Sequence, residues 1–215
     1  MLQTFGHLVP YALPVALSPL PVIAALMLLS SPRGGLGFLA GRLGALALAT
    51  GLAAALAETL QAHAGADVSR VWLRLGLGLV LAGLALRSLL RPPPKDAPLP
   101  GWLRALETAT PAAALRLGAL VTVANPKELA FVLAAGLAIG ADLPGPLATL
   151  GLSLAFALMA GAGVALPVLA ASLGGAAMRQ RLEPLRDALI VHRALVMGLV
   201  LAFIAALLIG DAIGA

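Results

Sequence analysis

Two short motifs place helix-breaking and polar residues inside stretches that are otherwise apolar. They are Ala124-Asn125-Pro126-Lys127-Glu128 and Ser18-Pro19-Leu20-Pro21, and Pro126 follows Pro19 by half the length of the 215-residue chain. Proline has no N–H and its ring clashes with the preceding turn, so each motif leaves backbone carbonyls without their helical donors. In hydrocarbon, such groups are tolerated where a broken helix is buried in protein or lines a polar cavity. The pair therefore predicts the two halves of a transport site.

The candidate substrate-binding residues are the prolines and polar neighbours of both motifs: Ser18, Pro19, Pro21, Asn125, Pro126 and Lys127. We expect the amide of Asn125 and the ammonium of Lys127 to meet an anionic or polar group of the substrate. The alternative for this motif is a proline kink held by Asn125, with Lys127 snorkelling to the membrane interface. For the first motif, the alternative is a set of kinks that shapes packing only.

The carboxylate of Glu128 is a candidate for proton coupling. It would be protonated in one facing state of a transporter and ionised in the other. The alternative is a salt bridge with Lys127, Arg42 or Arg116. Both interpretations remain open from the sequence.

Four arginines are candidates for binding lipid headgroups. Arg42 lies near the start of an apolar stretch and is suited to a lipid phosphate or a substrate carboxylate, or else it anchors the helix at the interface. Arg179, Arg181 and Arg186 lie in a basic, amphipathic segment that we expect on a membrane surface, where it binds anionic headgroups or only fixes topology. Glu58, at the far end of a span, is interpreted as an anchor.

Composition makes lipid the solvent for most of the chain. The sequence is 61% hydrophobic and 11% charged, with a mean hydropathy of +1.03, whereas a soluble domain carries about 25% charged residues. The net charge of +5 comes from positive residues that flank apolar runs, a pattern that sets topology and does not indicate nucleic-acid binding.

Residue types also argue against enzymatic and metal chemistry. The chain has no cysteine, and His7, His63 and His192 lie far apart, so no metal-ligand spacing is present. There is no nucleotide-binding P-loop motif and no clustered acid, base and nucleophile set. We therefore expect no enzyme, no metal and no cofactor.

The apolar runs predict an all-α polytopic membrane protein of about six spans. The expected spans cover residues 5–30, 36–58, 71–90, 112–139, 147–173 and 193–209. The expected divisions are a first three-helix repeat over 1–91, a Pro-rich linker with an interfacial helix over 92–111, and a second three-helix repeat over 112–215. The first and fourth helices are broken by the two motifs.

The distribution of basic residues predicts the orientation. Arginines and lysine gather in the loops after the first, third and fifth spans, which are then cytoplasmic, and both termini lie outside. Three spans per half give the halves opposite topology, the inverted-repeat plan of many secondary transporters.

At several motifs the sequence resembles the Gap family, the peptidoglycolipid or sulfolipid-1 addressing proteins of actinobacteria. The resemblance is carried by Ala16–Val22, Leu26–Ser30, Arg33, Phe38–Gly41, Asn125–Leu129 and Ala134–Gly136. It implies the scaffold of the lysine exporter superfamily and a homodimer. A departure is Leu20 between the two prolines, where amino-acid exporters tend to have glycine, which counts against an amino-acid cargo.

These observations favour a secondary exporter that works by alternating access. Its energy comes from the proton gradient, with Glu128 as the residue that carries the proton, or from the gradient of the cargo itself. Its expected cargo is an amphipathic lipid-linked molecule or a small polar metabolite, and its expected site is a bacterial cell membrane. The first alternative is a non-transporting membrane adaptor that delivers lipid to a synthase or export complex. The second is an amino-acid or cation exporter, although the spans hold few carboxylates for a metal.

Overall fold

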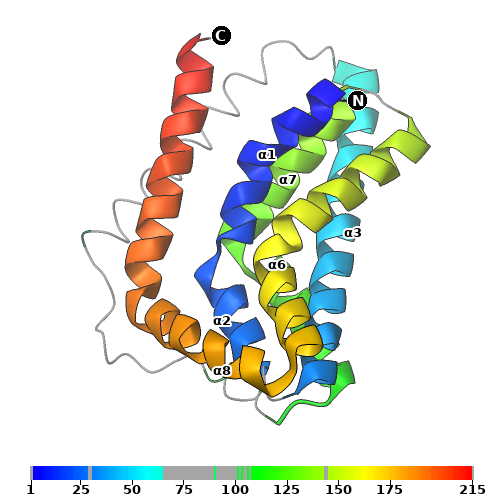
Figure 1. The fold of residues 1–215 in the computed structure, drawn as a ribbon. Coiled ribbons are helices and arrows are strands. Elements are labelled where there is room, and N and C mark those ends of the chain that lie inside the picture. The colour runs from blue at the N-terminus through cyan, green and yellow to red at the C-terminus, as the bar shows by residue number, and fades with distance from the viewer. Residues whose placement is uncertain are drawn as a thin grey trace.

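The computed structural model describes residues 2–28, 31–64, 90, 101, 103, 106, 108–142 and 145–214. Its helices are α1 (Leu2–Ala16), α2 (Pro19–Met27), α3 (Pro32–Ala64), α6 (Pro111–Ala124), α7 (Pro126–Ala141) and α8 (Pro146–Gly214). No strand occurs in the described part of the chain, so the predicted all-α class is confirmed. Figure 1 shows α1 and α7 side by side, with α3 along one side of the bundle.

Two pairs of helices are bent where the sequence motifs stand. α1 and α2 meet at 58°, and α6 and α7 meet at 77°. In both pairs the second helix begins with a proline, Pro19 or Pro126, at its first position. The two predicted helix breaks therefore lie at the expected residues.

The continuous helix α3 packs closely against α6 through glycines. A Cβ added at Gly41 would collide with the carbonyl oxygen of Leu115, and one at Gly118 would collide with that of Phe38. Small residues let backbones approach in lipid, where association depends on van der Waals packing. Gly136 of α7 likewise lies against the backbone of α3, closer to the C-terminal end of that helix. Both halves of the second broken helix are thus held against α3.

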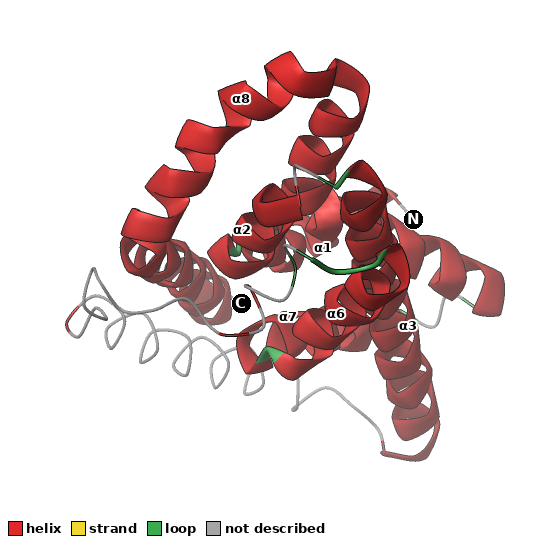
Figure 2. Ribbon diagram, turned by 90° about the horizontal axis from the view of Figure 1, so that it is seen from below, coloured by secondary structure: helices red, strands yellow, loops and turns green. Residues whose placement is uncertain are grey.

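Helix α8 extends from the expected fifth span to the end of the sixth. Its backbone leaves helical geometry at Gly175, with φ 63° and ψ −150°, a region that favours glycine. Pro167 lies buried within the same helix. Figure 2 shows α8 curving around α2 on the way to its C-terminal end.

In the part of the chain that the structure describes, two helices are long and apolar enough to cross a membrane, Arg33–Thr59 and Pro146–Arg193. The number rises to four among the described residues if each bent pair is one span. The predicted span over 71–90 lies outside the described residues, as does most of the linker over 92–111. The arrangement of six spans as two inverted repeats stays a prediction.

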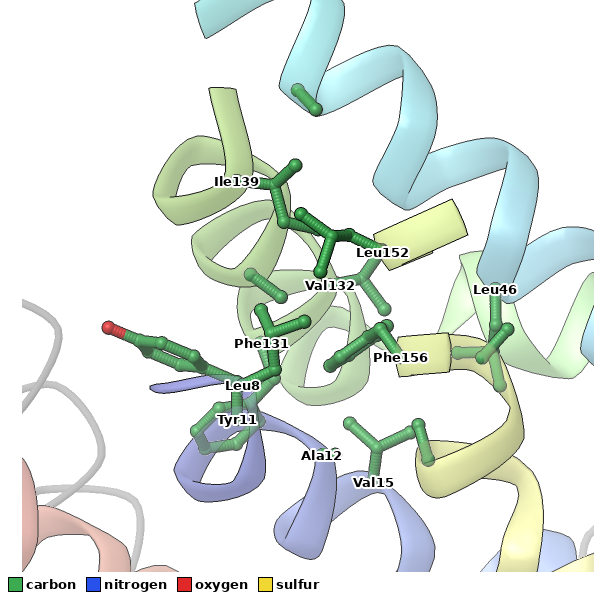
Figure 3. Close-up of a cluster of buried hydrophobic side chains, with 14 of the residues drawn as sticks. Leu8, Tyr11, Ala12, Val15, Leu46, Phe131, Val132, Ile139, Leu152 and Phe156 are labelled. Carbon is green, nitrogen blue, oxygen red and sulfur yellow. The ribbon is translucent and has the colours of Figure 1, made fainter. Parts of the chain in front are cut away.

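An apolar cluster joins α1, α3, α7 and α8 on one side of the breaks. It includes Leu8, Leu46, Phe131 and Phe156, all fully buried, and Figure 3 shows them converging from these helices. A second cluster, on the other side, joins α2 and the first turns of α3 and includes Leu103, which precedes α6. The polar motifs lie between the two clusters.

Candidate polar centre between the broken helices

The two breaks share one local geometry that follows from their prolines. Ser18 has φ −63° and ψ 117°, and Asn125 has φ −87° and ψ 104°. The residue before a proline is pushed from the helical to the extended region, and proline is suited to the first helical position because no donor is needed there. At the second break, the Asn125 side chain also caps α7 by accepting a hydrogen bond from the Lys127 N–H at 3.2 Å.

The first break leaves the Val15 carbonyl without its helical donor, because Pro19 stands four residues later and has no N–H. The guanidinium of Arg42 supplies a donor instead. Its Nη2 lies 3.1 Å from the Val15 carbonyl oxygen, which also accepts a longer hydrogen bond from the Ser18 N–H at 3.4 Å. A side chain of α3 thus stabilises the end of α1.

The same guanidinium also contacts both sides of the second break. Arg42 Nη1 lies 2.8 Å from Glu128 Oε2 at the start of α7 and 3.2 Å from Thr122 Oγ1 in the last turn of α6. The Thr122 hydroxyl in turn donates to the Gly118 carbonyl at 2.9 Å. The ion pair is shielded from solvent, with side chains 1% and 0% exposed. One arginine therefore links α1, α6 and α7.

A second contact joins the two breaks directly. Lys127 Nζ lies 3.4 Å from Ser18 Oγ, and both residues are buried. Glu128 uses its other oxygen to accept from Asn125 Nδ2 at 3.3 Å. We call the five residues Ser18, Arg42, Asn125, Lys127 and Glu128 the polar centre. It contains two cations and one carboxylate, so its formal charge is positive.

The structure brings together four of the predicted residues, namely Ser18, Asn125, Lys127 and Glu128. Pro19 and Pro21 are buried in α2, while Pro126 is exposed. Of the alternatives, Lys127 does not snorkel to an interface, because its ammonium lies near the buried Ser18 hydroxyl. The salt bridge proposed as the alternative for Glu128 is present, with Arg42 as the partner.

Arg42 itself was expected at the interface, as an anchor or a ligand of lipid phosphate. It lies instead in the interior, with no exposed surface. The other three headgroup candidates lie on α8 beyond Gly175. Arg181 is exposed, and Arg186 forms a surface pair with Asp187 at 3.0 Å. Arg179 is partly buried.

Sequence reasoning missed two contributors to the centre, the Thr122 hydroxyl and the Val15 carbonyl. The Val15 carbonyl could have been found from the sequence. In an α-helix each N–H donates to the carbonyl four residues earlier, so Pro19, which has no N–H, leaves the Val15 carbonyl free. No comparable signal marked Thr122. Within the described ranges, no group of three or more His, Cys, Asp or Glu residues could hold a metal ion.

Comparison with known proteins gives one finding. Residues 8–214 match the family described as Sap, sulfolipid-1-addressing protein, which is nearly the whole chain. No curated protein and no solved structure gives a significant match.

Proposed function

This chain belongs to the Sap, sulfolipid-1-addressing protein family, and from that premise we propose that it is a secondary exporter of an anionic, lipid-linked molecule. The observation that carries the proposal is the pair of contacts that join the two broken helices, Lys127 to Ser18 and Arg42 to Glu128. Burying ionic groups is costly, and in membranes such groups mark substrate and ion pathways.

The chemistry of the polar centre favours an anionic cargo. Arg42 and Lys127 contribute two positive charges against the single carboxylate of Glu128, and all three side chains are buried. The start of α7 adds to this field, because the N-terminus of a helix carries a partial positive charge. The sulfate or phosphate of a lipid headgroup would complement this excess, while the acyl chains remain in the bilayer.

Transport in this proposal uses alternating access. The two bends let the halves of each broken helix tilt, so the polar centre opens first to one face and then to the other. Glu128 is the proton carrier, protonated in one facing state and ionised in the other. The chain acts as a homodimer in a bacterial cell membrane, with both termini outside, and performs no chemical conversion of its cargo.

A reconstituted system tests this proposal. The full chain is placed in vesicles with a fluorescently labelled sulfated glycolipid, and dithionite quenching reports its movement between leaflets. We expect the wild type to move this probe faster than labelled phosphatidylcholine, and Asn125→Ala and Lys127→Ala to lose that movement. Arg116→Ala is the matched control, because Arg116 is an exposed cation of α6, and it should behave as the wild type.

Two results would contradict the proposal. The first is unchanged movement of the sulfated probe in both Asn125→Ala and Lys127→Ala, provided that circular dichroism and gel filtration show a folded protein. The second is equal movement of the two lipids in the wild type.

The second candidate function is a non-transporting adaptor, which the family's description as an addressing protein favours. An adaptor binds the lipid through the same centre but hands it to a synthase or an export complex. The wild type would then bind the sulfated probe, as measured by co-purification, and would leave it in its original leaflet. A partner complex would be captured with the wild type and lost with Lys127→Ala.

A further inference from the structure

Two buried hydroxyls, Thr50 on α3 and Ser153 on α8, take no part in the polar centre. Thr50 is 0% exposed and Ser153 is 1% exposed, and neither hydroxyl oxygen has a hydrogen-bond partner in the described part of the protein. A buried hydroxyl without a hydrogen-bond partner destabilises the fold. Ser153 faces α3, because a Cβ on Gly51 would lie 3.7 Å from its Oγ. A buried hydroxyl that lacks a protein partner is suited to binding a water molecule.

A carboxylate lies one helical turn further along the same seam. Thr149 precedes Ser153 by four residues, so both point to the same face of α8. The Thr149 hydroxyl donates to Glu58 Oε1 at 2.8 Å. Glu58 is half-buried and lies near the end of α3. The seam between α3 and α8 therefore combines the partly exposed carboxylate of Glu58 with the buried hydroxyls of Thr149 and Ser153. The buried Thr50 lies on α3 about two turns before Glu58.

An apolar layer separates these hydroxyls from the ion pair of the polar centre. Thr50 follows Arg42 by eight residues, which is about 12 Å along an α-helix. Leu46 stands midway on α3, and both Leu46 and Phe156 are fully buried in the apolar cluster shown in Figure 3. A chain of waters cannot cross while these side chains stay packed, so a proton would pass only when Leu46 and Phe156 move apart.

We propose that Glu58 takes protons from the aqueous phase and passes them, through water held at Thr50 and Ser153, to Glu128, with Leu46 and Phe156 as an apolar gate. The inference rests on the proposed function and names the proton path for the same site. In the transfer, the O–H bond of protonated Glu58 breaks and a proton moves along the waters. A new O–H bond forms on the Glu128 carboxylate, and Glu58, now ionised, takes its next proton from the medium.

Within the residues that the structure describes, few other charged groups face this path. At the Glu58 end, α7 brings Asp142, two residues past Gly140, which packs on Ala57. Helix α8 has no charged residue between Pro146 and Met178. Facing Glu128 are Arg42 from α3 and, on its own helix, Lys127. Among the described residues, Glu58 is thus the carboxylate that contacts α8 at this seam.

The test follows protonation of the two carboxylates by time-resolved infrared spectroscopy after an acid jump. The full chain is held in nanodiscs, and the carboxyl bands are assigned by their loss in Glu58→Gln and Glu128→Gln. We expect Glu58→Gln to slow the appearance of the Glu128 band by about tenfold, a barrier increase of about 1.4 kcal/mol. Thr50→Val combined with Ser153→Ala should slow that band similarly and leave the rate of the Glu58 band unchanged.

Two further variants keep the test decisive if the double variant folds poorly: one that retains the hydroxyl and one that is expected to speed the transfer. Thr50→Ser keeps a hydroxyl and should keep the wild-type rate, and Leu46→Ala makes room for water and should speed the Glu128 band. Thr59→Val and Glu183→Gln are controls, because these side chains are exposed and lie outside the path. Both should behave as the wild type.

The relay is overturned if the Glu128 band appears at the wild-type rate in Glu58→Gln or in the Thr50→Val, Ser153→Ala protein. It is overturned equally if Glu128 shows no protonated band at any pH that leaves the protein folded. One combination of results would refute the relay and leave the proposed function intact. The wild type would move the sulfated probe and Lys127→Ala would not, while the Thr50→Val, Ser153→Ala protein would keep the wild-type rate of the Glu128 band. Equal movement of both labelled lipids refutes the proposed function instead.

Discussion

At the scale of single residues, Arg42 performs two tasks that are usually separate. A guanidinium has five N–H donors in a rigid plane, and here they serve a carbonyl freed at the first break, a hydroxyl before the second and a carboxylate after it. The contacts that complete the backbone are therefore made by the same group that sets the charge of the polar centre. A substitution or protonation of Glu128 should therefore also change the hydrogen bond between Arg42 and the Val15 carbonyl at the end of α1.

This sharing predicts a large effect on stability. Removing one partner of a buried ion pair typically costs about 3–5 kcal/mol, because the other charge is left uncompensated, whereas replacing both with apolar residues costs far less. We expect Arg42→Met and Glu128→Leu each to lower the stability of the purified protein by this amount. The double variant should recover much of the loss in a thermal or denaturant titration.

The control for this cycle is the exposed pair of Arg186 and Asp187, with side chains 35% and 63% exposed. Surface pairs contribute about 0–1 kcal/mol, so Arg186→Ala should leave the unfolding midpoint nearly unchanged. Single variants of Arg42 and Glu128 that behave like Arg186→Ala would show that the buried pair does not hold the breaks together.

At the scale of elements, the position of α3 depends on glycines that admit a neighbouring backbone. Gly41 lies against the Leu115 carbonyl, whereas a Cβ at Gly44 would meet nothing within 4 Å. We expect Gly41→Ala to force α3 and α6 apart and to destabilise the protein by about 1–3 kcal/mol. Gly44→Ala should instead stabilise it by about 0.5–1 kcal/mol, because alanine is the better helix former.

The same titration measures both glycine variants side by side, and gel filtration checks that each remains monodisperse. Equal stability of the two would mean that the close contact of α3 and α6 is absent from the protein in detergent. Loss of stability only in Gly41→Ala would identify that contact as the one that positions Arg42.

Sequence patterns predicted the breaks and, as one alternative, the salt bridge of Glu128 with Arg42, but not that Arg42 contacts both breaks. Pro19 and Pro126 determine their own backbone geometry, so local rules were enough. Arg42 was expected at the interface because the span seemed to begin at residue 36. The helix in fact begins at Pro32, so Arg42 stands ten residues in, about 15 Å along the axis. The bend at Gly175 was missed because many glycines permit such a conformation and only packing selects one.

At the scale of the whole molecule, the orientation in the membrane is a prediction that the absence of cysteine makes simple to test. Single cysteines introduced as Asp142→Cys and Arg181→Cys lie at exposed positions. If the basic segment is cytoplasmic, a maleimide that cannot cross membranes should label position 142 in intact cells and position 181 only after permeabilisation. The reverse pattern would invert the topology, and labelling of both in intact cells would refute it.

The long sequence separation inside the ion pair has a consequence for biogenesis. Arg42 and Glu128 are 86 residues apart, and ribosomes add about 5–20 residues per second, so the arginine waits roughly 4–17 s for its carboxylate. During that interval the nascent chain carries an uncompensated cation in its first hairpin. The insertion machinery must keep this cation out of contact with lipid until α7 is made. In a chain that stalls earlier, the unpaired Arg42 would distinguish the incomplete protein for quality-control proteases.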